Sequence, residues 1–460
     1  MKVRFAALVF AATLAGVLSS AARGDEAPAV DEPRPVVPAP PASSIAPASS
    51  AATASSAAPG KKPPSDGESP TGADNVDYAT QRYEVAALPL LGGDSDIGFE
   101  FGAVGTLSRF DRGIVPYEWN MDLVLALSVK SSPTGTEITQ QSYQWNIDVP
   151  AVAGGNVRIN PQVMYAKTVN QLYFGLGNAS SPVLPAGQSA RYFEFDDRQA
   201  RVRDLNRISL GGPVDAMIGA IYRFEDPGPY LPSKLAQDAA AGKILGVEPM
   251  SLGTAIAGIV IDTRDSEIFP RQGSYHQIGL RGTIGVPFGD NVRYGAFGAM
   301  LAMYRPLVGP FVLALRAVTD LEFGDVPVYD LYTGGPFRAD EMPGGSAGIR
   351  GVPDGRYSGL IKLFGNAEVR AMLIRFHIAS QKFRIGGNLL FDAGRLWSDY
   401  TFHSPLDGRG LGVKWGAGAG AYLQWGQAAI FRVEAAYSPD AASENPSLPI
   451  GVYVEDGVMF

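Results

Sequence analysis

From residue 79 to residue 460 the sequence consists mainly of stretches of about ten residues in which apolar and polar side chains alternate. Clusters of Gly, Pro, Asp and Asn separate these stretches. Such alternation is typical of β-strands, because successive side chains of a strand point to opposite faces of the sheet. The sequence therefore predicts an all-β fold over this region.

The alternation separates apolar from charged side chains. In residues 361–373 every odd position is apolar or Gly, whereas Glu368 and Arg370 occupy even positions. Residues 382–393 repeat this arrangement and place Asp392 on the polar face. Long strands with one apolar and one charged face are typical of barrels that contact lipid outside and water inside.

A soluble β-sandwich also alternates and is the alternative fold. A closed transmembrane barrel is favoured because strands in a bilayer must leave no backbone group unpaired. The apolar faces also end in aromatic residues, as expected of an interfacial girdle: Trp415, Tyr422, Trp425 and Tyr437. The expected strand centres lie near residues 85, 101, 124, 146, 164, 196, 216, 257, 280, 298, 315, 367, 387, 417, 432 and 455. The sequence therefore predicts a sixteen-stranded antiparallel β-barrel over residues 79–460.

The residues before the barrel indicate export. In residues 1–22, Lys2 and Arg4 precede an apolar stretch that ends in small residues, which is the layout of a secretory signal peptide. Residues 23–78 are rich in Ala, Pro and Ser and have too little apolar surface to offset the entropy of ordering. We expect a disordered periplasmic tail there and, with the barrel, location in the bacterial outer membrane.

Composition excludes several classes of function. The net charge is -8, which disfavours binding to the phosphate backbone of nucleic acids. The sequence has no Cys and only three His (His276, His377 and His403), which we interpret as ordinary strand or loop residues. We therefore expect no metal site and no cofactor.

Three stretches resemble the barrel of the superfamily that contains BamA, TamA and the two-partner-secretion transporters, also described as bacterial surface antigen barrels. The first stretch, residues 261–282, is similar to a strand-turn-strand of that family. In its turn, Pro restricts φ and Gly supplies a permissive backbone. The matched turn residues are Asp262, Arg264, Asp265, Pro270 and Gly273.

The second stretch, Ile349-Arg350-Gly351-Val352, is similar to the (V/I)-R-G-(F/Y) tip of the family's loop after strand eleven, with Val352 in place of the usual aromatic residue. Residues 323–357, which contain it, also lie between the eleventh and twelfth expected strands. The resemblance implies that this loop folds back into the barrel.

The third stretch, residues 390–397, is similar to the family's F-x-D-x-G on strand thirteen, with Leu390 in place of the first Phe, and it contains Asp392 and Gly394. Residues 366–370 resemble the N-x-E-x-R of strand twelve. The alternation independently places Glu368 and Asp392 on the lumen face of neighbouring strands. A planar guanidinium suits such carboxylates, so we expect Arg350 to bind them.

The last expected strand, residues 450–460, resembles the terminal signal by which outer-membrane barrels are recognised for insertion. It ends in Phe460 and carries Val458, Val454 and Val452, although Asp456 interrupts the apolar face. The implied partners are outer-membrane lipid and the barrel assembly machinery that inserts the protein.

Gly344, Ser346 and Gly348 match the G-x-S-x-G pattern of a hydrolase nucleophile elbow. That elbow requires a strand before it and a helix after it, and no stretch of helical period follows. We expect Ser346 not to be a nucleophile and the protein not to be an enzyme.

The family resemblance implies a role in inserting or exporting polypeptide, or lipid, with an unfolded or secreted protein as client. The alternative is a passive pore or a structural surface antigen. Family transporters normally carry periplasmic POTRA domains, and residues 23–78 are too few and too poor in apolar residues to form one. The sequence identifies no client.

Overall fold

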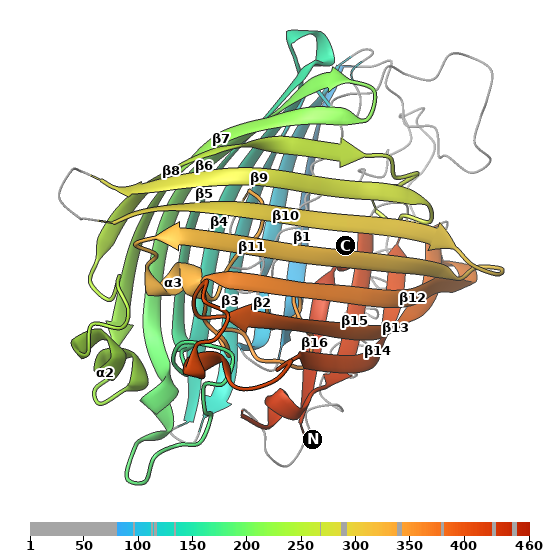
Figure 1. Ribbon diagram of the computed structural model, residues 1–460. Helices are drawn as coiled ribbons and strands as arrows, with labels where there is room; N and C mark the ends of the chain where they lie inside the picture. The colour runs from blue at the N-terminus through green and yellow to red at the C-terminus, as the bar shows by residue number, and fades with distance from the viewer. Residues whose placement is uncertain are drawn as a thin grey trace.

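The computed structural model describes residues 81–460 except 95–96, 112–113, 115–116, 133–134, 267, 287–291, 338–342, 379–380, 426–428 and 444–448. The expected signal peptide and the expected tail lie outside the described residues. Within them, sixteen antiparallel strands follow one another around a closed barrel, and the first strand pairs with the last (Figure 1). The predicted barrel is confirmed, and the alternative of a two-layer sandwich is wrong.

The strands are β1 (Arg82–Asp94), β2 (Gly98–Phe110), β3 (Trp119–Ser132), β4 (Gly135–Val152), β5 (Val157–Leu172), β6 (Glu194–Gly211), β7 (Val214–Pro229), β8 (Met250–Asp262), β9 (Gly273–Gly285), β10 (Arg293–Pro306), β11 (Val312–Gly324), β12 (Ile361–Ile378), β13 (Gln381–Trp397), β14 (Lys414–Trp425), β15 (Ala429–Tyr437) and β16 (Ile450–Asp456). Each expected strand centre lies inside the corresponding strand. Two short α-helices, α2 (Lys234–Ala240) and α3 (Val328–Leu331), lie in connections. Four 3-10 turns complete the described elements: η1 (Ala153–Gly155), η2 (Ala190–Phe193), η3 (Pro405–Asp407) and η4 (Pro439–Ser443).

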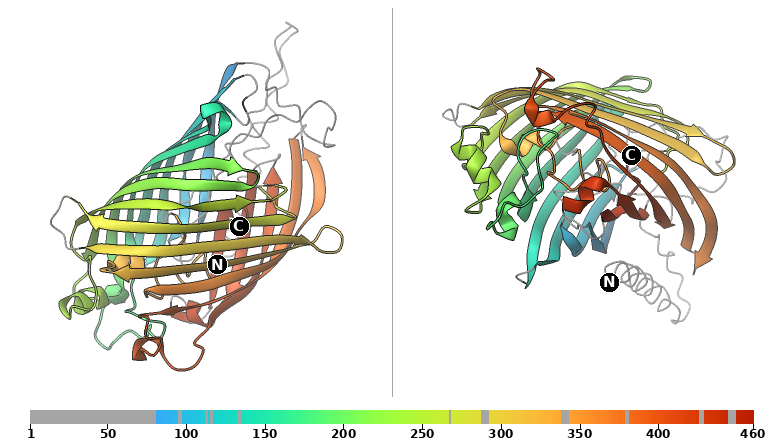
Figure 2. Two further views of the ribbon diagram at one scale, coloured as in Figure 1. Left: turned by 45° about the horizontal axis from the view of Figure 1, so that its top comes forward. Right: turned by 60° about the horizontal axis from the view of Figure 1, so that its bottom comes forward.

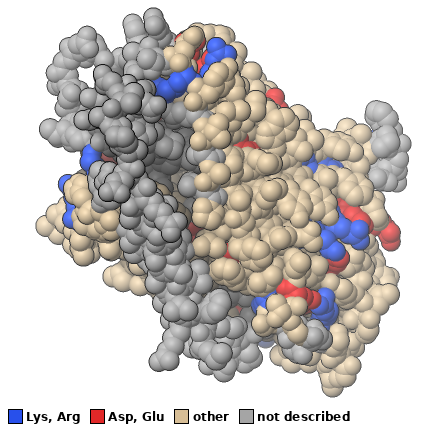
Figure 3. Space-filling view, turned by 180° about the vertical axis from the view of Figure 1, so that it is seen from behind, with Lys and Arg blue, Asp and Glu red and all other residues tan. Residues whose placement is uncertain are grey.

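The period-two alternation sorts side chains between the outside and the inside of the barrel. Leu389 and Phe391 are 66% and 51% exposed on the outer face of β13, whereas Asp392 is fully buried. On the outer face Trp415 packs against Phe391 and Tyr437, with ring centroids 6.4 and 5.8 Å apart. Uncharged residues cover most of the barrel wall visible in Figure 3, and charged residues gather toward its margins.

One residue assigned to the girdle lies on the other face. Tyr422 is 1% exposed and donates a hydrogen bond to Glu368 inside the barrel. Tyr422 shares the face of the even-numbered residues of β14. The alternation of side chains along this strand is therefore enough to place Tyr422 inward. The expectation that Tyr422 belongs to the outer girdle was wrong.

The connections are long at one end of the barrel. Helix α2, shown in green, and the red connection between β13 and β14 lie at this end in both views of Figure 2. The described residues between β11 and β12, 325–337 and 343–360, start there and fold into the lumen, which confirms the predicted infolded loop. Two parallel β-bridges, Leu176 with Ser358 and Leu245 with Pro327, tie this loop to other connections.

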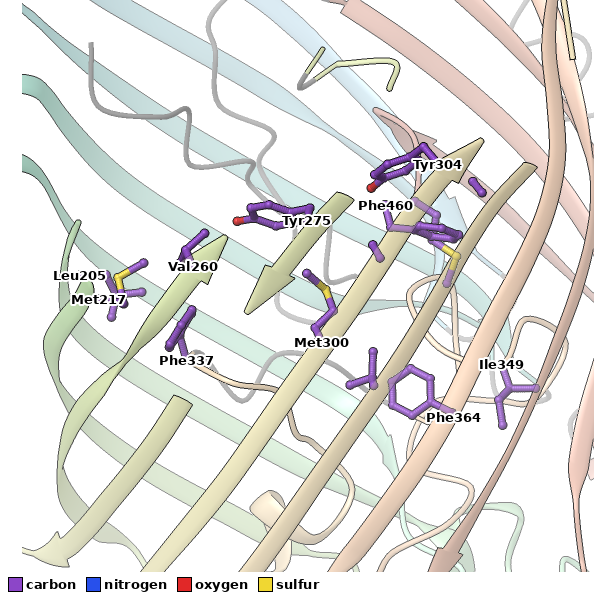
Figure 4. Packing of buried hydrophobic residues seen from close by; sticks show 14 of the residues in the cluster. Leu205, Met217, Val260, Tyr275, Met300, Tyr304, Phe337, Ile349, Phe364 and Phe460 are labelled. Atoms are coloured by element: carbon purple, nitrogen blue, oxygen red, sulfur yellow. The ribbon is translucent and has the colours of Figure 1, made fainter. Parts of the chain in front are cut away.

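The hydrophobic core lies inside the barrel. Figure 4 shows Met300 and Tyr304 from β10 and Phe364 from β12 pointing inward, with Ile349 of the infolded loop near them. Each of these side chains is 3% exposed or less. The loop therefore supplies apolar packing as well as polar contacts. No helix in the described residues combines the length and the apolar character needed to cross a bilayer.

The end of the last strand differs from the prediction. Strand β16 ends at Asp456, and Gly457 follows with a φ of +72°. The backbone then turns inward, so that Phe460 is 6% exposed and its ring lies 6.4 Å from that of Tyr304. The expectation that one strand continues through residue 460 was wrong, because packing inside the lumen outweighs continuation of the outer alternation.

Candidate functional site in the barrel lumen

The tip of the infolded loop is a tight turn built around glycines. Gly345 and Gly351 have φ values of +74° and +96°, which residues with a Cβ rarely adopt. Backbone hydrogen bonds close the turn from Gly345 N to Val352 O at 2.7 Å and from Val352 N to Ile349 O at 3.0 Å. This turn fixes the direction in which Arg350 leaves the loop.

Arg350 binds carboxylates from three strands of the described barrel wall. Its Nε and Nη2 donate to the two oxygens of Asp392 on β13 at 2.8 and 3.0 Å. Its Nη1 donates to Glu368 of β12 at 2.6 Å and to Glu434 of β15 at 2.9 Å. We refer to Arg350, Glu368, Asp392 and Glu434 as the Arg350 cluster. All four side chains have 0% exposure, so the contacts are shielded from solvent.

Two further arginines balance the charge of the Arg350 cluster. Arg370 Nη1 lies 3.9 Å from Glu368 Oε2, and Arg432 Nε lies 3.8 Å from Glu434 Oε2. These distances are too long for hydrogen bonds but give favourable charge interactions. Burial by itself disfavours the charged form of Arg350, yet the carboxylates of Asp392, Glu434 and Glu368 raise its pKa well above the ordinary value. Arg350 therefore remains charged.

Glycines in the wall make room for the loop tip. A Cβ on Gly416 of β14 would lie 1.8 Å from the carbonyl oxygen of Arg350. A Cβ on Gly394 of β13 would lie 2.9 Å from Cδ1 of Ile349. Gly394 and Gly416 thus leave space for the loop tip that a side chain would fill.

Tyr453 of β16 also contacts the loop tip. The backbone N–H of Gly351 donates to the Tyr453 hydroxyl at 2.7 Å, and Tyr453 is 1% exposed. Tyr422 of β14 reaches the same region through Glu368. Each of the strands β12 to β16 therefore contributes a side chain around the tip. The resemblance identified Glu368, Asp392 and Gly394 but not Glu434 or Tyr453. The even-position alternation of residues 430–437 signals an inward Glu434, whereas no sequence signal identifies Tyr453.

A second anchor fixes the start of the infolded loop. Asp330 of α3 accepts hydrogen bonds from Arg223 of β7 at 2.6 and 3.1 Å and one from Tyr294 of β10. Lys362 donates to the Asp330 carbonyl oxygen at 2.8 Å and to Glu322 at 2.7 Å. Burial by itself raises the pKa of Asp330, but the contact with Arg223 outweighs it and lowers this pKa. The loop is thus bound to opposite parts of the wall.

The turn motif lies apart from Arg350. Arg264 forms a bidentate pair with Asp262 at 3.0 and 2.8 Å and stacks on Tyr275, with its guanidinium carbon 4.0 Å from the ring centroid. Asp265 accepts from the backbone N–H of Arg271 at 2.9 Å, and Gly273 has a φ of +99°. These contacts shape the turn between β8 and β9.

The end of the chain shares one partner with this turn. Arg370 donates to the carbonyl oxygens of Phe460 at 2.9 Å and Pro270 at 3.2 Å. Val458, two residues before Phe460, is only partly buried. Arg370 therefore joins the turn motif and the last residues to Glu368 of the Arg350 cluster.

The remaining sequence candidates are dispersed. Ser346 is 1% exposed within the loop, and no helix follows it between residues 347 and 360. His276 is on β9, His377 is on β12, and His403 is in the connection after β13. No group of His, Asp and Glu residues in the described ranges has the arrangement of a metal site.

A closed sixteen-stranded barrel with an apolar outer face and a long loop bound in its lumen defines a bacterial outer-membrane β-barrel protein. More specifically, residues 250–445 of the chain match the family model described as the Omp85 superfamily domain. This domain covers the infolded loop and the strands that supply Glu368, Asp392 and Glu434. The resemblance seen in the three sequence stretches is confirmed.

Two outer-membrane proteins are among the solved structures with a similar fold. BamA from Haemophilus ducreyi lacking POTRA domains 1–3 is 13% identical with a TM-score of 0.53, and the match covers 82% of this chain and 70% of that one. CdiB from Escherichia coli is 14% identical with a TM-score of 0.51, and the match covers 81% of this chain and 62% of that one. The chain thus spans less than two thirds of CdiB. A search of curated proteins found no match.

Proposed function

We propose that this protein helps to insert polypeptides into the outer membrane or to export them across it. The observation that carries the proposal is the junction of β1 and β16, which we call the seam. Among the described residues the seam has two residue pairs, Gly93 with Val454 and Asp94 with Tyr453. By contrast, thirteen pairs join β1 to β2.

The short register makes the seam the easiest place to open the barrel. A backbone hydrogen bond contributes about 0.5–1.5 kcal/mol net, so separating two pairs costs far less than separating thirteen. An open edge within a bilayer leaves backbone N–H and C=O groups without partners, which is unfavourable by several kcal/mol for each group. A client strand that pairs with this edge satisfies those groups.

The lumen of the described barrel supports a route through the seam rather than through the centre. The loop tip fills the lumen beside β12 to β16 through the Arg350 cluster. At the long-loop end, Val328 and Leu331 of α3 are buried in an apolar cluster with Tyr173, Leu235 and Leu252 from the walls and other connections. A passive pore needs an open polar passage and predicts a steady conductance.

A disulfide across the seam tests the proposal. The sequence has no Cys, so the double variant Gly92→Cys/Glu455→Cys introduces the sole thiols. These positions continue the register of Asp94 with Tyr453 by one step on the lumen face. A Cβ at Gly92 lies 3.0 Å from the Val454 carbonyl oxygen. This contact is close, and we expect the two strands to shift enough to admit it because only two pairs join them. The matched control Ala87→Cys/Gly105→Cys crosslinks the long β1–β2 register, where a Cβ at Gly105 meets no atom within 4 Å.

The readout is the set of outer-membrane and secreted proteins in cells that depend on each variant. We expect the oxidised seam variant to lose the same proteins as a gene deletion, reductant to restore them, and the oxidised control to behave like the parent. If cells with the oxidised seam variant retain the parental set of proteins, the proposal is wrong and a passive or structural role is favoured.

A further inference from the structure

Tyr453 connects the seam with the infolded loop. Its backbone pairs with Asp94 of β1 on one side and with Glu434 of β15 on the other. Its hydroxyl accepts the hydrogen bond from the Gly351 N–H at 2.7 Å. One residue therefore belongs to one of the two seam pairs and also contacts the residue next to Arg350.

The position of the Tyr453 ring is tightly defined. The ring packs in a buried cluster with Leu390 of β13 and Ala436 of β15. A Cβ on Gly451 would lie 2.4 Å from the Tyr453 hydroxyl and 3.2 Å from the Gly351 Cα, so glycine is required where the ring and the loop meet. A displacement of β16 moves the ring, and the ring cannot move without breaking its contact with the loop tip.

We propose that Tyr453 is a positioning residue that couples the seam to the loop: its hydroxyl keeps β16 beside β1 while the Arg350 cluster is intact. Opening of the seam then requires loss of the Gly351–Tyr453 hydrogen bond, and release of the loop tip from the wall weakens the seam. This inference rests on the proposed function only in treating the seam as the site of opening. It states which contact controls that opening.

The test is hydrogen exchange, followed by mass spectrometry, of the full-length protein in lipid nanodiscs. Tyr453→Phe removes the hydroxyl and keeps the ring, so the barrel retains its packing. We expect the amides of residues 82–94 and 450–456 to exchange about fivefold faster, as follows from losing one buried hydrogen bond that opposes opening. Oxidation of Gly92→Cys/Glu455→Cys in the Tyr453→Phe background should abolish the increase, because the disulfide prevents the seam from opening.

Tyr173→Phe is the matched control. Tyr173 is equally buried, and its hydroxyl donates to Asp238 of α2 at 3.1 Å, away from the seam and from the Arg350 cluster. We expect the seam amides to exchange at the parental rate in this variant. The inference is overturned if Tyr453→Phe leaves seam exchange unchanged, or if Tyr173→Phe raises it equally. Neither result depends on a client, so failure here is distinguishable from failure of the proposed function.

Discussion

At the scale of single residues, the charge of Arg350 has the largest expected effect on the stability of the fold. Its guanidinium binds both oxygens of Asp392 and also reaches Glu368 and Glu434. Removing one member of a buried ion pair leaves partners that are desolvated and uncompensated. A lysine cannot reproduce the fork of donors, so the substitution Arg350→Lys is not conservative here.

We therefore expect Arg350→Ala to lower the free energy of unfolding by about 3–5 kcal/mol. Arg350→Lys should recover only part of this loss. The measurement is urea unfolding in detergent, followed by heat-resistant migration on gels. Arg409→Ala is the control, because Arg409 is exposed in the connection after β13. Equal stability of Arg350→Ala and Arg409→Ala would show that the cluster contributes nothing.

The space left by Gly416 gives a second residue-scale prediction. Gly416→Ala places a Cβ 1.8 Å from the carbonyl oxygen of Arg350, so the loop tip has to move. We expect faster proteolysis of residues 343–360 and a lower unfolding temperature. Gly282→Ala on β9 adds a Cβ that meets no atom within 4 Å, and it should behave like the parent. Identical proteolysis of the two variants would mean that the tip does not occupy this recess.

The residues of this site differ in how far they could be predicted. Glu368 and Asp392 followed from period two and from the family resemblance, because both signals are local in sequence. Glu434 meets Arg350, and Tyr453 meets Gly351, only because the wall curves and brings β15 and β16 back toward β12. That curvature depends on barrel closure, so local patterns do not report it.

At the scale of elements, the infolded loop is bound at both of its ends. The Arg350 cluster binds its tip, and Asp330 of α3 binds Arg223 and Tyr294 near its start. No motif signalled the second anchor, because its residues come from β7, β10 and a loop helix that are far apart in sequence. The contact with Arg223 lowers the pKa of Asp330, which makes this anchor dependent on pH.

The direction of the pH dependence follows from the lowered pKa of Asp330. A carboxyl with a lowered pKa in the folded state stabilises the protein above the ordinary Asp pKa of about 3.9, and the contribution is lost as the pH falls through the folded value. At pH 7 we expect the free energy of unfolding to be about 1.5–3 kcal/mol higher for the parent than for Asp330→Asn. The difference should disappear at low pH. Urea unfolding at several pH values measures it, and a constant difference would contradict the assignment.

At the scale of the whole molecule, the fold follows largely from the alternation of apolar and polar residues along each strand. All sixteen expected centres lie within strands of the described barrel, because an apolar outer face and a polar inner face impose the same alternation on every strand. The inward turn of residues 457–460 could not be predicted in this way. It depends on contacts of Phe460 with Arg370 and Tyr304 from distant strands.

The central claim is that the loop closes the lumen and that the barrel opens at its seam. Single-channel recording in planar bilayers tests this most directly, with the parent compared with the oxidised Gly92→Cys/Glu455→Cys variant. We expect small, unstable openings from the parent, and fewer of them from the oxidised variant. A large, steady conductance that the disulfide leaves unchanged would contradict the claim, because ions would then pass through an open lumen.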